Sequence, residues 1–185
     1  MPEMISTQRL DLTPFTPDFL RASLDGDLDQ AVRLLAASLP DPWPTYRDTF
    51  QLRLEQLGSD PALQPWLLRG MILRETRELI GHIGFHTGPN PDYLKDVAPG
   101  GIEFGYTVLE PFRRQGFARE AAEALMNWAR DQHGISRFVV SIRPDNVPSL
   151  ALASRLGFQR IGEQMDEVDG LEHIFRLDFQ TVNRS

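Results

Sequence analysis

Residues 101–129 read GIEFGYTVLEPFRRQGFAREAAEALMNWA, a strand pattern followed by a short polar loop and a helix pattern. In the first part, apolar residues alternate with Glu103 and Thr107, which is the period of a half-buried strand. Pro111 has no backbone N–H to donate to a strand ladder, so the strand is expected to end near Leu109. After the loop, alanine, leucine and tryptophan recur at helical spacing, which predicts an amphipathic helix.

The loop between this strand and this helix, residues 113–118, has the composition of an anion site. A helix N-terminus presents unpaired backbone N–H groups and about half a positive charge. Gly116 and Ala118 allow close approach to the backbone, and Arg113 and Arg114 add positive charge. The loop is therefore a candidate cradle for a phosphate or pyrophosphate group. The alternative is an ordinary glycine-containing loop with two solvated arginines.

The same loop, followed by a second block, resembles a known family. Residues 113–118 read RRQGFA and match the acyl-CoA pyrophosphate loop, Q/R-x-x-G-x-G/A, of the GNAT superfamily of N-acyltransferases. Residues 138–158 resemble the next strand of that family, its N-x-x-S helix start at Asn146 and Ser149, and its Gly-Phe exit. The ordered pair is most similar to the RimJ/RimL-like branch, whose members acetylate protein N-terminal amines and, in some cases, small amines. The resemblance covers about residues 79–179.

The resemblance implies an α/β (α+β) fold. Its central mixed, mostly antiparallel sheet has about seven strands, with splayed fourth and fifth strands, flanked by about four to five helices. Residues 1–185 contain no repeat, low-complexity tract or linker, so a single domain is expected. The local patterns predict strands at residues 8–15, 65–74, 79–86, 102–109, 137–142, 167–168 and 171–179, and helices from residue 16 and at residues 27–39, 45–57, 118–134 and 146–156.

Composition places the chain among soluble globular proteins. It has 185 residues, a formal net charge of −7, 41% hydrophobic and 24% charged residues. No apolar run reaches about 18 residues, and the first residues have no signal-peptide core, so no membrane partner is expected. The acidic balance argues against nucleic acid. The absence of cysteine excludes disulfides and a cysteine nucleophile, and it favours a cytoplasmic location.

A transfer from acyl-CoA to an amine needs a pyrophosphate cradle and a pantetheine channel. The resemblance implies that the backbone of residues 113–118 forms the cradle. It also implies that pantetheine inserts between splayed strands, along residues 107–109 and 141–146, with a backbone N–H near Val108 on the thioester carbonyl. The residues so implied to bind acetyl-CoA are Thr107, Val108, Leu109, Arg113, Arg114, Gln115, Gly116, Phe117, Ala118, Asn146 and Ser149.

The reaction also needs a base and an acid. An alkyl ammonium must lose a proton before its nitrogen can attack. Glu103 is the candidate base, directly or through water; the alternative is that it binds the amine or pairs with an arginine. Ser149 is the candidate acid for the departing CoA thiolate, and its alternative is helix capping. Ala153 and Ser154 lie farther along that helix, where many family members carry a tyrosine that acts as the general acid. This departure is consistent with the RimL-like branch, in which serine has that role.

The acceptor site is less readable. Trp43 and His86 are its candidate residues besides Glu103. The alternatives are that Trp43 caps the hydrophobic core and that His82 and His86 are partly exposed strand histidines. No further cysteine or histidine clusters with the histidine pair, so no metal is expected. Residues 87–99 form a loop that either folds over the substrate or only connects two strands.

Together these features predict an acetyl-CoA-dependent N-acetyltransferase. The acetyl group would pass to a primary amine, either a protein N-terminal amine or a small-molecule amine, by direct attack in a ternary complex. The acceptor, the acyl length and the general base stay open. Many family members are homodimers, but nothing in this sequence demands one. The alternative is a non-catalytic acyl-CoA-binding or regulatory protein. A P-loop or Rossmann protein is disfavoured, because neither glycine motif occurs where it should.

Overall fold

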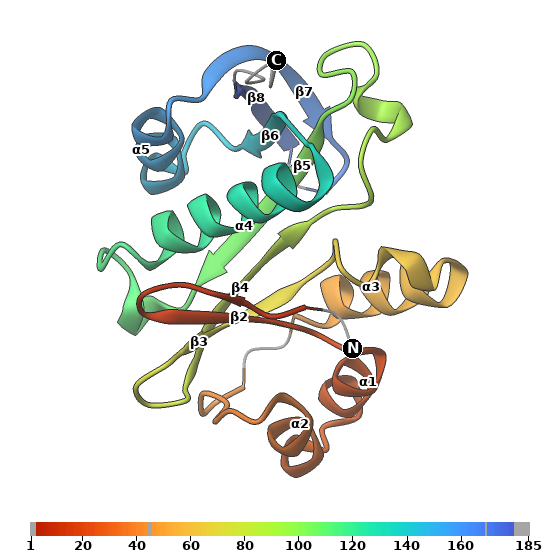
Figure 1. The fold of residues 1–185 in the computed structure, drawn as a ribbon, viewed down its shortest axis with the longest axis vertical. Coiled ribbons are helices and arrows are strands. Elements are labelled where there is room, and N and C mark those ends of the chain that lie inside the picture. The colour runs from red at the N-terminus through yellow and green to blue at the C-terminus, as the bar shows by residue number, and fades with distance from the viewer. Residues whose placement is uncertain (1–2, 44–45, 169, 180–185) are drawn as a thin grey trace. The chain divides into compact units, whose positions relative to one another are not determined.

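The computed structural model describes residues 3–43, 46–168 and 170–179. The strands of this part of the chain form a mixed sheet with the order β1-β2-β3-β4-β5-β6-β8-β7, and Figure 1 shows the individual helices and strands. The strands are β1 Ile5–Ser6, β2 Leu10–Pro14, β3 Arg69–Leu73, β4 Leu79–Phe85, β5 Ile102–Val108, β6 Arg137–Ile142, β7 Gln159–Asp166 and β8 Gly170–Asp178. The α-helices are α1 Pro17–Asp25, α2 Leu28–Leu35, α3 Arg47–Ser59, α4 Phe117–His133 and α5 Val147–Leu156, with short 3₁₀ turns η1 Pro61–Leu63, η2 Asp92–Leu94 and η3 Glu110–Phe112.

The predicted fold class is confirmed. Strand β5 pairs with β6 in parallel, whereas β1–β2, β2–β3, β3–β4, β6–β8 and β7–β8 are antiparallel. The described residues contain eight strands, against about seven expected, because the short β1 pairs with β2 and carries no recognisable strand pattern of its own. None of the described helices combines the length and apolar content needed to cross a membrane.

The chain divides into two compact units. The first contains Met1–Gly84 and Tyr106–Leu125, and the second contains Phe85–Gly105 and Met126–Ser185. Strands β4 and β5 and helix α4 each contribute to both units.

In the first unit, helices α1 to α3 share a core with the sheet. Phe15, Phe19 and Phe50 are buried in this core. The predicted start of α1 is confirmed, because the Thr16 side chain accepts a hydrogen bond from the backbone N–H of Phe19. Strand β3 begins only at Arg69, since the residues before it continue the turns that follow η1.

Helix α2 corrects the prediction of a helix over residues 27–39. It ends at Leu35, because Ala36 takes a left-handed conformation with φ 53° and its N–H bonds to the carbonyl of Val32. The helical spacing also predicts an apolar stripe of Leu28, Val32, Leu35 and Leu39, and this prediction is wrong in part. Leu28 is 39% exposed and Val32 38%, whereas Ala31 and Leu35 are buried. The face of α2 that packs against the core therefore carries Ala31 and Leu35.

In the second unit, phenylalanines form the core around the sheet. Phe85 lies 6.3 Å from Phe104 and 6.5 Å from Phe138 between ring centroids, and Phe104 lies 6.2 Å from Phe158. Strand β6 has the predicted bounds. Helix α5 ends at the left-handed Gly157, with φ 89°.

The last hairpin differs from the predicted one. Residues 167–168, expected as a strand, form a turn, and the Val168 N–H donates to the Asp166 carboxylate at 2.8 Å. The strand before this turn is β7, which begins directly after Gly157 and Phe158, where the sequence indicates a return to a strand, and it pairs with β8 over its whole length with one register shift. The dipeptide Asp169-Gly170 is typical of a hairpin turn and predicts one here, but Asp169 lies outside the described residues.

Candidate active site

The loop before α4 lies in the first unit and has the backbone of an anion cradle. Residues 113–116 are exposed, and Arg114 and Gly116 have positive φ angles of 62° and 84°. The first i to i−4 bond of the helix runs from the Glu120 N–H to the Gly116 carbonyl, at 3.1 Å. The N–H groups of Phe117 and Ala118 precede that bond and have no intrahelical acceptor. Such a helix start suits a phosphate group.

Arg113 is not simply a solvated arginine. Its Nε donates to the carbonyl oxygen of Val108, at 2.9 Å, and so ties the loop back to the end of β5. On the neighbouring strand, the Ile80 carbonyl accepts a hydrogen bond from the Leu109 N–H, at 2.9 Å. The end of β5 and the loop are therefore held together by backbone acceptors.

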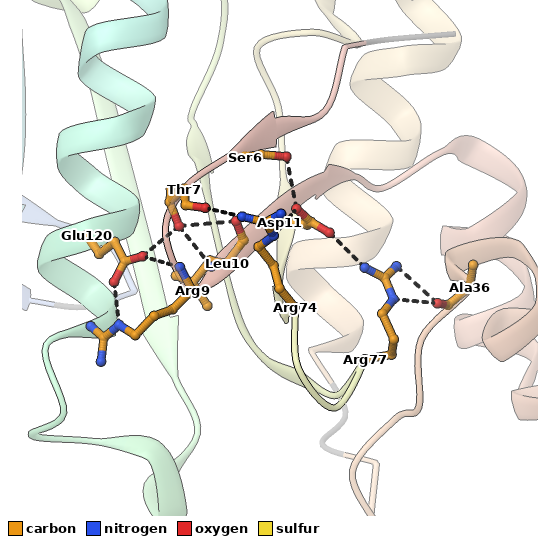
Figure 2. Close-up of polar contacts among 9 residues, drawn as sticks. All are labelled: Ser6, Thr7, Arg9, Leu10, Asp11, Ala36, Arg74, Arg77 and Glu120. Atoms are coloured by element: carbon orange, nitrogen blue, oxygen red, sulfur yellow. Dashed lines mark hydrogen bonds and ion pairs between the residues drawn. The ribbon is translucent and has the colours of Figure 1, made fainter.

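A residue far away in the sequence also holds the loop. Figure 2 shows the Arg9 guanidinium and the Thr7 hydroxyl on the Glu120 carboxylate, at 2.7 and 2.6 Å. Arg9 also donates to the carbonyl of Gln115, at 2.9 Å, and lies over the Phe117 ring, 4.3 Å from its centroid. Burial raises the pKa of the Glu120 carboxyl, but the hydrogen bonds from Thr7 and Arg9 and the Arg9 charge outweigh it and lower the pKa.

Strand β2 is held by polar contacts of its own, which Figure 2 shows around Asp11. Asp11 is buried in this strand and accepts hydrogen bonds from Ser6, at 2.9 Å, and from Arg77, at 2.8 Å. Arg77 also donates to the carbonyl of Ala36, where α2 ends. The chain around Arg9 is therefore held by two ion pairs, that of Arg9 with Glu120 and that of Asp11 with Arg77.

Glu103 lies in the second unit and is buried, with 5% of its surface exposed. The Ser141 hydroxyl donates to one carboxylate oxygen at 2.6 Å, and His86 Nδ1 lies 3.6 Å from the other. Burial raises the pKa of this carboxyl, but hydrogen bonds from His86, Ser141 and Tyr93 and the charge of His86 outweigh it, so the pKa lies below its ordinary value. Glu103 is thus a carboxylate at neutral pH.

The imidazole of His86 connects this buried carboxylate with solvent. Its side chain is 41% exposed, against 6% for Glu103, and its backbone N–H donates to the Glu103 carbonyl at 2.9 Å. Gly105 leaves room for the ring, because a Cβ atom there would lie 2.9 Å from His86 Nε2. A carboxylate beside a half-exposed imidazole can accept and pass on a proton. The sequence missed Ser141 and Tyr93 as partners of Glu103.

Asn146 and Ser149 meet at the start of α5, in the same unit. The Asn146 side chain accepts a hydrogen bond from the backbone N–H of Ser149, at 3.3 Å, and so caps the helix. The cap is therefore Asn146, and the Ser149 side chain is not needed for this capping bond. Ser149 itself lies half-buried in the first helical turn.

The parallel ladder between β5 and β6 pairs Ile102 with Phe138 and Glu103 with Val139. Strand β6 continues to Ile142, beyond Ser141. The ladder therefore ends at Glu103 and Val139, and the splay of the two strands stays a prediction.

Trp43 and His82 belong to the first unit. Trp43 packs in an aromatic group with Phe19, Tyr46 and Phe50, at centroid distances of 6.4, 6.5 and 6.2 Å. His82 is 8% exposed and meets the Tyr46 ring at 4.7 Å, so the expectation of a partly exposed histidine is wrong at this position. Burial, with a smaller effect of the Arg53 charge, lowers the pKa of His82 to about 4, which keeps it neutral.

Comparison with known proteins decides the family. The model of the acetyltransferase (GNAT) domain matches residues 9–159. The chain belongs to the GNAT acetyltransferase family. The match spans both the loop that Arg9 holds and the Glu103 site, and the protein is therefore an N-acyltransferase of a family that binds acetyl-CoA and an amine acceptor.

Two relatives illustrate the range of this family. An uncharacterized N-acetyltransferase of Bacillus subtilis, YjdG, is 27% identical over 161 residues, which cover 84% of this chain and 89% of YjdG. An N-alpha-acetyltransferase of Saccharolobus solfataricus is 25% identical over 148 residues, covering 77% and 80% of the two chains.

Solved structures share the fold. One is an acetyltransferase from Salmonella typhimurium that modifies the N-terminal serine of ribosomal protein L7/L12, with a TM-score of 0.65, 19% identity, and coverage of 96% of this chain and 100% of that one. Another is RimL, a ribosomal L7/L12 alpha-N-protein acetyltransferase in complex with coenzyme A, with a TM-score of 0.62, 19% identity, and coverage of 96% and 98%.

Proposed function

We propose that this GNAT enzyme transfers an acetyl group from acetyl-CoA to a primary amine by direct attack in a ternary complex. The observation that carries the proposal is the buried Glu103 carboxylate, whose lowered pKa keeps it ionised beside the half-exposed His86. A protein N-terminal amine is the favoured acceptor class, since the names of two structural neighbours specify one. A small amine is the other candidate. Cytoplasmic location and a homodimer remain predictions.

The loop at the start of α4 fits the pyrophosphate of CoA. Gly116 has a φ of 84° and no side chain, so a ligand can reach the backbone N–H groups at this helix start. Arg113 and Arg114 add charge, and the carbonyl-anchored Arg113 keeps the loop in place. Residues 107–109 would hold the pantetheine and thioester, with a backbone N–H near Val108 as the donor to the carbonyl oxygen.

Bound acetyl-CoA supplies the activated acetyl group, and the residues of this chain would move the protons. Glu103, directly or through water, would take the proton of the acceptor ammonium and leave the amine lone pair free. His86 and Ser141 keep the carboxylate ionised for this purpose. The Ser149 hydroxyl would give a proton to the CoA thiolate, and Asn146 would contact the pantetheine. His86 would contact the acceptor, whereas the packing of Trp43 against the core of the first unit favours the alternative that Trp43 caps that core.

The first test is release of the CoA thiol from acetyl-CoA, followed with a thiol reagent over a panel of amines and N-terminal peptides. The chain has no cysteine, so the background is low. Amine-dependent release is the expected result, and double-reciprocal plots should intersect. Binding of CoA without release for any acceptor would favour the non-catalytic alternative. Absence of CoA binding would contradict the proposal itself.

Ser149→Ala is expected to lower kcat about 10²-fold with CoA affinity nearly kept, because only the proton donor is lost. The helix cap should survive, since it uses the backbone N–H of Ser149. Ser154→Ala, an exposed position on the same helix, is the control. Single-turnover rates and calorimetric CoA affinity measure the two quantities. A rate equal to that of the Ser154 variant would remove Ser149 from the chemistry.

Gly116→Val is expected to raise KM for acetyl-CoA by about tenfold or more, because its side chain blocks the approach to the loop backbone. Gly134→Val is the matched control, since Gly134 also has a positive φ, of 70°, with no atom near its Cβ position. Both variants should lose about 1–2 kcal/mol of stability from left-handed strain. Equal effects of the two on KM would contradict the cradle.

A further inference from the structure

We propose that Arg9 is a further residue of the CoA pyrophosphate site, an inference that rests on the proposed function. Arg9 lies between β1 and β2, 111 residues before Glu120 in the sequence. Nothing in the loop pattern of residues 113–118 points to it. The geometry of its guanidinium, however, places it on the loop that is proposed to hold the pyrophosphate.

The three nitrogens of the Arg9 guanidinium lie next to different groups. Nε donates to the Glu120 carboxylate at 2.7 Å, and Nη1 donates to the Gln115 carbonyl at 2.9 Å. Nη2 lies 3.3 Å from the position that a Cβ atom would take at Gly116. A phosphate oxygen that approaches the backbone at Gly116 therefore meets this nitrogen as a charged donor. A planar guanidinium can serve a carboxylate and a phosphate with separate N–H groups.

The guanidinium is held before any ligand arrives. The Glu120 carboxylate also accepts from the backbone N–H of Arg9, at 2.8 Å, and from the Thr7 hydroxyl, at 2.6 Å. The guanidinium also lies over the Phe117 ring, with its Cζ atom 4.3 Å from the ring centroid. The side chain is still 43% exposed, so solvent and ligand can reach it. Binding then costs little further side-chain entropy, which is the advantage of preorganisation.

Arg9 differs in this respect from the loop's own arginines. Arg113 uses its Nε on the carbonyl of Val108, and Arg114 has a positive φ within the exposed loop. Arg9 alone among these three is fixed by a carboxylate, a carbonyl and an aromatic ring. We therefore assign to Arg9 both the positioning of the loop and a direct charge contact with the pyrophosphate.

The test is the calorimetric affinity for CoA at low and high salt, with the full chain. Arg9→Ala should weaken CoA binding by about ten- to a hundredfold and reduce the salt dependence of that binding. Glu120→Gln loosens the anchor of the guanidinium but keeps the Arg9 charge, so its salt dependence should stay near that of the wild type. Arg21→Ala, an exposed ion-pair position on α1, is the control for a lost arginine charge.

Turnover of acetyl-pantetheine provides the second measurement, because it lacks the pyrophosphate. Arg9→Ala should lower kcat/KM for this substrate much less than it lowers kcat/KM for acetyl-CoA, and turnover of this substrate shows that the variant is folded. Unchanged CoA affinity would overturn the inference. So would a loss of affinity with unchanged salt dependence, because Arg9 would then only position the loop. Failure of the wild-type chain to bind CoA is a different outcome and would overturn the proposed function.

Discussion

Glu103→Gln is expected to lower kcat/KM by about 10²- to 10⁴-fold while CoA affinity stays nearly unchanged. Glutamine has the shape of glutamate, and its carbonyl oxygen can still accept the hydrogen bond from Ser141. It cannot accept a proton from an ammonium. The lost function is thus the base, and the fold should survive.

The control for this variant is Glu163→Gln, which removes an exposed carboxylate of the same unit from its pair with Arg160. Steady-state kinetics with the best acceptor of the panel give kcat/KM, and calorimetry gives the CoA affinity. A rate of Glu103→Gln within twofold of the control would contradict the assignment of the base. The carboxylate would then only bind the amine or hold His86.

The same carboxylate predicts a pH dependence of stability. Burial raises the pKa of Glu103 in the folded chain, but the hydrogen bond and the charge of His86, together with hydrogen bonds from Ser141 and Tyr93, outweigh burial and lower this pKa. Its contribution to stability is therefore full above the unfolded-state value, about 4.3, and is lost as pH falls through the folded-state value. Ser141→Ala removes one of the donors and should move the acid limb of activity to higher pH. Thermal unfolding and kcat/KM from about pH 3 to 8 measure both effects.

Local signals explain which parts of the fold were predictable. Strand β6 has its predicted bounds because a run of apolar, β-branched residues stops at Pro144. Helix α1 starts at the predicted cap because Thr16 and Pro17 each favour a helix start through their own chemistry. The predicted helix over residues 27–39 is longer than α2. Several leucines in this stretch fit more than one helix face, and only packing selects the face with Ala31 and Leu35.

The sequence predicts only those parts of the candidate site whose residues lie close together in the chain. The cradle loop and Glu103 lie in one strand–loop–helix segment, so their pattern is visible in the sequence. The donors to Glu103 are not, because Ser141 is 38 residues away and reaches it through the pairing of β5 with β6. The contact of Arg9 with Glu120 spans 111 residues. His82 packs against Tyr46, which is 36 residues earlier in the sequence. A pattern within the strand of His82 cannot predict this contact.

Gly81→Ala is expected to destabilise the chain by about 3 kcal/mol, because a Cβ atom there has no space. It would lie 2.1 Å from the carbonyl oxygen of Thr107 and 3.0 Å from the Cα of Val108. Both are backbone atoms of β5, which cannot rotate away as a side chain can. The ladder between β3 and β4 also shifts its register next to Gly81, between Met71 and Ile72.

Gly58→Ala is the control for this substitution, since a Cβ atom at Gly58 meets nothing within 4 Å. Gly58 lies within α3, where alanine is the better helix former, so this variant should gain up to about 1 kcal/mol. For a chain of this size, the loss at Gly81 corresponds to a Tm lower by roughly 6–12 °C. An unchanged Tm for Gly81→Ala would show that β4 and Thr107 do not approach as closely as described. A lower Tm with weakened CoA binding at a temperature where the chain stays folded would connect this backbone contact with the proposed thioester strand.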